Sequence, residues 1–157
     1  MTSVCCQGFR CGSRKEIRAG ANKYNNPFSD EVGLFKTSED GTSRMMQTTS
    51  IFRLIDETGR VFGEEGRMEG TEYFGAMRKL PDIRRPALPP GVAAGGHGGS
   101  HGQLTNNFIE SILLNQTPLV DIYQALSMTV PGIVAHQSAL KDGETLKVPQ
   151  YIPPQKS

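Results

Sequence analysis

Several ingredients of common protein classes are missing or scarce in this 157-residue chain. It has no tryptophan, and its only three cysteines are Cys5, Cys6 and Cys11. An odd number of closely spaced cysteines, with no second cluster, predicts neither a disulfide framework nor a zinc tetrahedron. We expect three thiols in a strand, which is compatible with a reducing compartment.

Excess charge and long apolar runs are also lacking. The 17 Lys and Arg residues nearly balance the 16 Asp and Glu residues, so the basic excess of a nucleic-acid or membrane-surface binder is absent. No apolar run approaches the roughly 20 residues of a membrane helix, and the first residues lack the pattern of a signal peptide. The sequence predicts a soluble chain with no nucleic-acid or membrane partner. It favours the cytoplasm without fixing the location, because the true N-terminus can lie upstream.

Glycine and proline are abundant instead, with 18 and 10 residues, and they predict much loop. They concentrate in residues 77–103, a Pro/Gly-rich loop within what we expect to be a single domain spanning 1–157. Pro81, Pro86, Pro89 and Pro90 exclude a helix and a central strand there.

Alternating patterns separated by turn residues predict several short strands. We expect a hairpin turn at Asp40-Gly41. The predicted strands are residues 2–11, 31–37, 42–54, 60–62 and 67–74, the last two flanking a turn at 64–66. Successive strands joined by short turns form an antiparallel sheet.

Beyond residue 103 the hydrophobic period becomes helical. Leu104, Phe108 and Ile112 follow i, i+4 spacing, and Asp121 is a plausible N-cap for a second helix. Pro131 is expected to kink or split that second helix. Strands followed by helices predict an α+β fold, with an open, mostly antiparallel sheet and C-terminal helices packed on one face.

A glycine-histidine loop at residues 95–102 comes directly before the first helix. Its glycines permit close approach of a ligand, Ser100 is positioned to cap the helix, and His97 and His101 are suited to proton transfer near neutral pH. The alternative is a flexible linker. Two histidines on such a loop supply too few fixed ligands for a metal site, so none is expected.

This loop is not a nucleotide fingerprint. The Gly-Lys-Ser/Thr of a P-loop is missing, and a proline-rich stretch stands where a Rossmann turn needs a strand. We therefore expect no cofactor-binding residues, and no cofactor bound by this chain alone.

The Gly-Gly-His-Gly-Gly-Ser-His run, together with residues 118–125 and 129–141, resembles the C-terminal part of the Gfo/Idh/MocA oxidoreductase superfamily. The nearest branch is the NAD-dependent glycosidases typified by α-N-acetylgalactosaminidase. Residues 25–28 and 34–38 are similar to the same branch, and the resemblance covers about residues 4–150.

The resemblance implies a two-part protein. In the family, an N-terminal Rossmann domain holds NAD(P), and a C-terminal domain on an open sheet supplies much of the substrate pocket and the oligomer interface. This chain matches only the second part. The resemblance therefore implies a fragment inactive alone, NAD(P) for the full-length protein, a Rossmann domain in cis or in trans, and a homo-oligomer formed through the open sheet face.

The same resemblance implies a sugar-type substrate. In the glycosidase branch NAD takes a hydride from the sugar, elimination and water addition follow, and the hydride is returned. His97 would transfer a proton or close over the sugar, and we expect His101, Tyr24 and Asn25 as substrate contacts, although a plain turn explains Tyr24 and Asn25 equally well. His136 is expected to cap or pack. The alternative to an enzyme part is a non-catalytic, stand-alone sheet domain that acts as an assembly or interaction module.

Overall fold

The computed structural model describes residues 1–10, 19–48, 58–77, 79 and 87–153. The chain forms two compact units. The first combines Met1–Phe52 with Glu110–Ser157, and the second is Arg53–Ile109. The single domain expected from the sequence stays a prediction.

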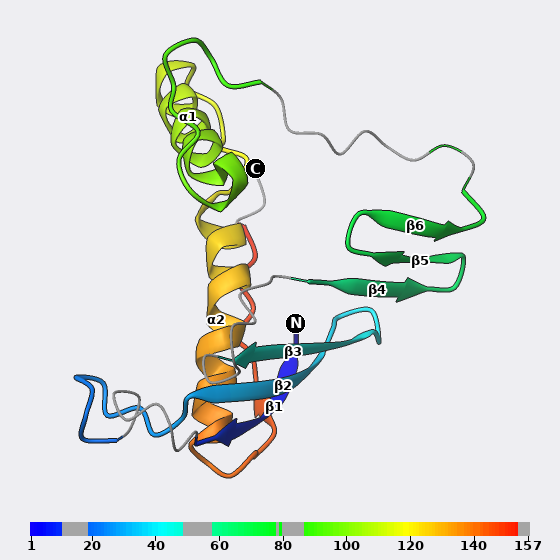
Figure 1. The fold of residues 1–157 in the computed structure, drawn as a ribbon, viewed down its shortest axis with the longest axis vertical. Helices are drawn as coiled ribbons and strands as arrows, with labels where there is room; N and C mark the ends of the chain where they lie inside the picture. The colour runs from blue at the N-terminus through cyan, green and yellow to red at the C-terminus, as the bar shows by residue number, and fades with distance from the viewer. Residues whose placement is uncertain (11–18, 49–57, 78, 80–86, 154–157) are drawn as a thin grey trace. The chain divides into compact units, whose positions relative to one another are not determined.

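A four-stranded antiparallel sheet forms the framework of the first unit (Figure 1). Its strands are β1 (Ser3–Phe9), β2 (Asp30–Lys36), β3 (Thr42–Thr48) and β7 (Leu146–Lys147), in the order β3-β2-β1-β7. The predicted hairpin at Asp40-Gly41 is confirmed: Asp40 has φ 57°, and the Thr37 N–H donates to the Gly41 carbonyl at 2.8 Å. The predicted strand 42–54 is confirmed as far as Thr48, and residues 49–54 lie outside the described part.

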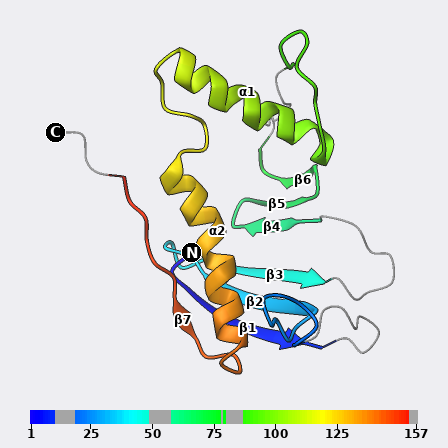
Figure 2. The same cartoon turned by 90° about the vertical axis from the view of Figure 1, so that its left-hand side faces the viewer.

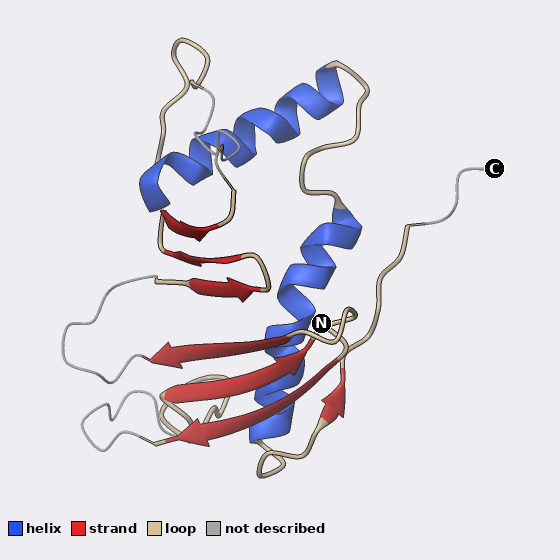
Figure 3. Ribbon diagram, turned by 90° about the vertical axis from the view of Figure 1, so that its right-hand side faces the viewer, coloured by secondary structure: helices blue, strands red, loops and turns tan. Residues whose placement is uncertain are grey.

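Helix α2 (Ile122–Ala139) lies across one face of this sheet (Figures 2 and 3). Val4 and Phe35 are cross-strand partners on that face, and both are buried. The remaining buried apolar residues of the core are Cys6, Val134, Ala135, Ala139 and Val148. The two alanines let the helix approach the sheet closely, and full burial of a side chain such as Val4 stabilises the fold by about 1.5–3 kcal/mol.

Two sequence signals in α2 have different outcomes. The carboxylate of Asp121 accepts a hydrogen bond from the Gln124 N–H at 2.8 Å, so the predicted N-cap is confirmed. The helix runs unbroken through Pro131, which is buried. Of the two effects expected from that proline, the split is therefore wrong.

The Ser138 hydroxyl joins three segments of the first unit. Ser138 is fully buried. Its Oγ accepts from the Cys6 N–H at 2.9 Å and donates to the Glu144 carbonyl at 2.6 Å. Because β7 pairs only with Ser3 and Val4, this hydroxyl replaces the strand partner that β1 lacks at Cys6.

The second unit contains a three-stranded antiparallel meander of β4 (Arg60–Gly63), β5 (Gly66–Glu69) and β6 (Glu72–Gly75). The hairpin turn predicted at 64–66 is confirmed at residues 64 and 65, while Gly66 is already the first residue of β5. The single strand predicted at 67–74 is wrong, because Gly70 adopts φ 59° and its N–H donates to the Gly59 carbonyl at 2.9 Å. This turn divides the segment into β5 and β6.

Helix α1 (Ser100–Leu113) confirms the helix predicted after the glycine-rich loop. Antiparallel strands come first, and the helices follow. The α+β class with an open antiparallel sheet and C-terminal helices is therefore confirmed. Neither α1 nor α2, the helices of the described part, is long and apolar enough to cross a membrane.

Candidate functional site

The glycine-histidine loop of the second unit is a folded turn that leads directly into α1. A short 3-10 segment, His97–Gly99, precedes Ser100, and His97 itself has φ 52°. The Ser100 hydroxyl donates to the His97 carbonyl at 2.9 Å. Ser100 is thus the first residue of the helix and closes the turn with its hydroxyl. The expectation that Ser100 caps the helix start is wrong, because its backbone is already helical and its hydroxyl donates to a carbonyl.

Three glycines allow this loop to fold back on the first turn of α1. A Cβ at Gly95 would lie 2.9 Å from the Cβ of His101, and one at Gly96 would lie 3.1 Å from its ring. The N–H of Gly102 donates to the Ala94 carbonyl at 2.8 Å. A side chain at these positions would displace the ring or the backbone, so the glycines serve close packing. This packing favours a structured loop over a flexible linker.

His97 and His101 are brought together by this turn. Their ring centroids are 5.2 Å apart and their planes are inclined by 57°. Both residues are exposed. Two neighbouring imidazoles in contact with solvent can exchange protons with a bound molecule or hold a metal ion between them.

Tyr24 and Asn25 lie in a turn of the first unit. Asn25 has φ 51°, and its side-chain oxygen accepts from the Gly20 N–H at 2.7 Å. Tyr24 is 78% exposed, with the Nζ of Lys23 4.7 Å from its ring centroid. The Asn25 amide thus braces its own turn, as the plain-turn alternative requires. The substrate contacts assigned to Tyr24 and Asn25, and to His101 in the other unit, stay predictions.

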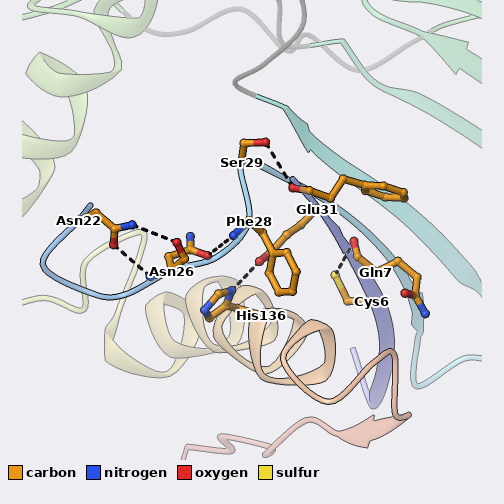
Figure 4. A network of polar contacts seen from close by, with 9 residues as sticks. Cys6, Gln7, Asn22, Asn26, Phe28, Ser29, Glu31 and His136 are labelled. Atoms are coloured by element: carbon orange, nitrogen blue, oxygen red, sulfur yellow. Dashed lines mark hydrogen bonds and ion pairs between the residues drawn. The ribbon is translucent and has the colours of Figure 1, made fainter. Parts of the chain in front are cut away.

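His136 of α2 contacts Glu31 of β2, a pair that the sequence does not predict (Figure 4). The Nδ1 of His136 is 2.5 Å from Oε1 of Glu31, and these two side chains are 34% and 22% exposed. The Phe28 ring meets the imidazole edge-on at 6.3 Å. The packed role expected for His136 is confirmed. Its partner Glu31 lies 105 residues away, so no local sequence pattern could predict the pair.

The thiol of Cys6 lies on the same face of the sheet as Glu31. Burial raises the pKa of Cys6 to about 11, and the negative charges of Glu31 and Cys5 act in the same direction. Cys6 therefore stays protonated at neutral pH and is a poor nucleophile. Cys5 and Cys6 are free thiols in β1, as expected, and Cys11 lies outside the described residues.

Neither a closed metal centre nor a dinucleotide cradle is built by the residues that the structure describes. No three His, Cys, Asp or Glu side chains among them are grouped to hold an ion. The N–H groups of Gly99 and Gly102 in the glycine-histidine loop donate to the carbonyls of Gly96 and Ala94. No strand lies among the described residues directly before the loop, so it does not fit a pyrophosphate. That this chain binds no cofactor alone stays a prediction.

Two solved structures that share this fold are dehydrogenases. One is myo-inositol dehydrogenase from Lactobacillus casei in complex with NAD(H) and myo-inositol, with a TM-score of 0.60 and 15% identity over 98% of this chain and 43% of that chain. Another is levoglucosan dehydrogenase in complex with NADH and levoglucosan, with a TM-score of 0.62 and 10% identity over 95% of this chain and 45% of that chain. The chain spans less than half the length of these neighbours. No family model and no curated protein matches it.

Proposed function

We propose that this chain is the substrate-binding and oligomerisation part of an NAD(P)-dependent sugar oxidoreductase or redox-assisted glycosidase. A Rossmann domain, in cis or in trans, would supply the nucleotide site. The observation that carries the proposal is the fold, which aligns over 95% or more of this chain with under half of two sugar dehydrogenases. Over half of each neighbour thus has no counterpart here, which supports a fragment that is inactive alone.

In this proposal His97 moves a proton to or from a sugar hydroxyl, or closes over the sugar. Three observations support it: the imidazole is exposed, its turn is fixed by the Ser100 hydroxyl, and the ring of His101 lies beside it. His101 would bind a hydroxyl group of the sugar. Substrate contacts by Tyr24 and Asn25, which lie in the first unit, stay predictions of their own. The oxidoreductase outcome is supported by the fold neighbours, and the glycosidase outcome by the loop motif and the resemblance it carries.

The test begins with the coding sequence directly upstream in frame. A Rossmann-coding stretch there would be joined to this chain, and the product assayed on a panel of sugars and glycosides with NAD and NADP. Net formation of reduced nicotinamide identifies an oxidoreductase, whereas glycoside cleavage without net change in nicotinamide identifies a glycosidase. Calorimetry of the 157-residue chain alone should show no NAD binding, and micromolar affinity would contradict the proposal.

A second candidate is a non-catalytic assembly module, and exposed apolar side chains on the face of the four-stranded sheet opposite α2 favour it. Phe9, Leu34 and Met46 lie on the face opposite α2 and are 54%, 53% and 55% exposed. A second copy packing face to face would cover them in an isologous contact. A stable oligomer with no Rossmann-coding sequence beside the gene, and no activity with any added nucleotide domain, would select this candidate.

A further inference from the structure

The separation of the two loop histidines matches that of two imidazoles bound to one metal ion. Zn–N bonds of about 2.0–2.1 Å with near-tetrahedral angles place the centroids of two ligating rings about 5 Å apart. The centroids of His97 and His101 are 5.2 Å apart. This separation of the rings therefore allows one ion to be bound by both.

Both histidines are carried by a backbone that the turn already holds. His101 lies in the first turn of α1, and its side chain occupies the space that a Cβ at Gly95 or Gly96 would need. The carbonyl of His97 accepts from the Ser100 hydroxyl. When one imidazole has bound an ion, the second is therefore at a high effective concentration, which is the condition for chelation.

The surroundings of the pair determine which ion it suits. Between residues 83 and 109 the sequence contains no Asp, Glu or Cys, and the described residues offer no third ligand of these types in a group with the pair. Hard cations such as Mg²⁺ and Ca²⁺ need oxygen ligands, whereas imidazole suits Zn²⁺, Cu²⁺ and Ni²⁺.

We propose that His97 and His101 form a two-imidazole chelate for one borderline divalent transition-metal ion, with Zn²⁺ as the reference ion. The chelate is open: the remaining coordination positions hold water or an oxygen of a bound molecule. From the sequence no metal site is expected here, because two histidines are too few fixed ligands. The proposed chelate departs from that expectation, because it requires two protein ligands only.

Occupancy of this chelate has a consequence beyond the proposed function. An imidazole nitrogen that binds the ion no longer accepts a proton. The ion would therefore block proton transfer by His97 and fix the loop on α1. Metal binding itself is independent of whether the chain belongs to an enzyme, so the chelate and the proposed function are tested by separate readouts.

The first experiment is titration calorimetry of the tag-free 157-residue chain with Zn²⁺. We expect one ion per chain. The variants His97→Gln and His101→Gln should each lower the association constant at least about tenfold, because each removes one arm of the chelate. The matched control is Asn107→Gln, on the same helix, which should leave binding unchanged. One ion per two chains, or a single-histidine variant with the parent affinity, would overturn the proposal.

The pH dependence gives a second criterion. Both imidazoles must be neutral to bind. At acid pH the logarithm of the association constant should therefore rise with a slope of two per pH unit for the parent and one for each variant. A slope of one for the parent would show that a single histidine binds the ion, and would overturn the chelate.

A third readout needs no variant and stands if a variant fails to fold. Substoichiometric Cu²⁺ should broaden the NMR signals of His97 and His101 before those of His136, whose imidazole contacts Glu31 in the first unit. Equal broadening of all three histidines, or earlier broadening of His136, would contradict the chelate.

Discussion

Replacing Ser138 with alanine is expected to destabilise the first unit by about 2 kcal/mol. The substitution leaves the N–H of Cys6 without its partner in a residue that is 1% exposed, and an unsatisfied buried donor costs about 1–3 kcal/mol. The Glu144 carbonyl loses its bond as well, but Glu144 is exposed and water can replace the hydroxyl. Alanine regains roughly 0.5 kcal/mol as the better helix former.

The measurement is urea unfolding followed by far-UV circular dichroism, because the chain has no tryptophan to report by fluorescence. For a chain of this size, about 2 kcal/mol corresponds to a fall in Tm of about 4–8 °C. The matched control is Ser127→Ala, the same substitution at an exposed position of α2, which should change stability by less than about 0.5 kcal/mol.

Hydrogen exchange of the Cys6 amide gives a local readout of the same bond. Its protection should fall in Ser138→Ala and not in Ser127→Ala. If Ser138→Ala is no less stable than Ser127→Ala and protection at Cys6 is retained, then the hydroxyl does not replace a strand partner and the reasoning is refuted.

Three further predictions concern the proposed site, the sheet face and the buried thiol. Once a Rossmann domain is joined to the chain, His97→Ala should lower kcat by about 10²–10⁴-fold and His101→Ala by less. His136→Ala should instead cost about 1–3 kcal/mol of stability, and a His97→Ala enzyme within about twofold of the parent would contradict the proton-transfer role. Light scattering of the 157-residue chain should show a dimer or a larger oligomer. Leu34→Arg should dissociate this oligomer without changing the circular dichroism, and a parent chain that is monomeric at high concentration would contradict the sheet-to-sheet contact. Because the Cys6 pKa is raised to about 11 in the fold, stability should be full below about pH 8.5 and fall as the pH rises toward 11, since the unfolded thiol ionises first. Cys6→Ala should flatten that decline, and an equally steep decline in this variant would exclude Cys6 as its cause.

Local signals in the sequence predicted the elements whose causes are local. Asp40-Gly41 marks a hairpin because aspartate and glycine tolerate the left-handed backbone that the turn needs. Asp121 marks a helix start because its carboxylate can reach an N–H three residues on. Alternation located β1 and β2 because each has one face against α2 and one away from it.

The failures have local causes too. Gly70 stands in an otherwise regular strand pattern, where glycine indicates a bulge as readily as a turn. The hydroxyl of a serine at a helix start can accept from a backbone N–H or donate to a carbonyl. At Ser100, which follows a turn of consecutive glycines, the hydroxyl donates to the His97 carbonyl.

The candidate site also contains features that the sequence predicted and contacts that it did not. The 95–102 loop was visible because its glycines and histidines are consecutive. The Glu31–His136 contact and the Ser138 hydroxyl join segments more than a hundred residues apart, and nothing nearby distinguishes Ser138 from the exposed Ser127 on the same helix. Partners of this kind are set by tertiary packing, which a single sequence does not encode in any short window.

The first unit is assembled from the two ends of the chain, and this has a consequence during synthesis. The side chains that bury Val4 and Cys6 include Val134 and Val148, which a ribosome adding about 5–20 residues per second delivers roughly 6–30 seconds later. Until then the apolar face of strands β1, β2 and β3 lacks the helix α2 that covers it in the folded unit. Nascent chains stalled before α2 should therefore be the species that chaperones bind and proteases cut, and emergence of α2 and β7 from the ribosome should end both.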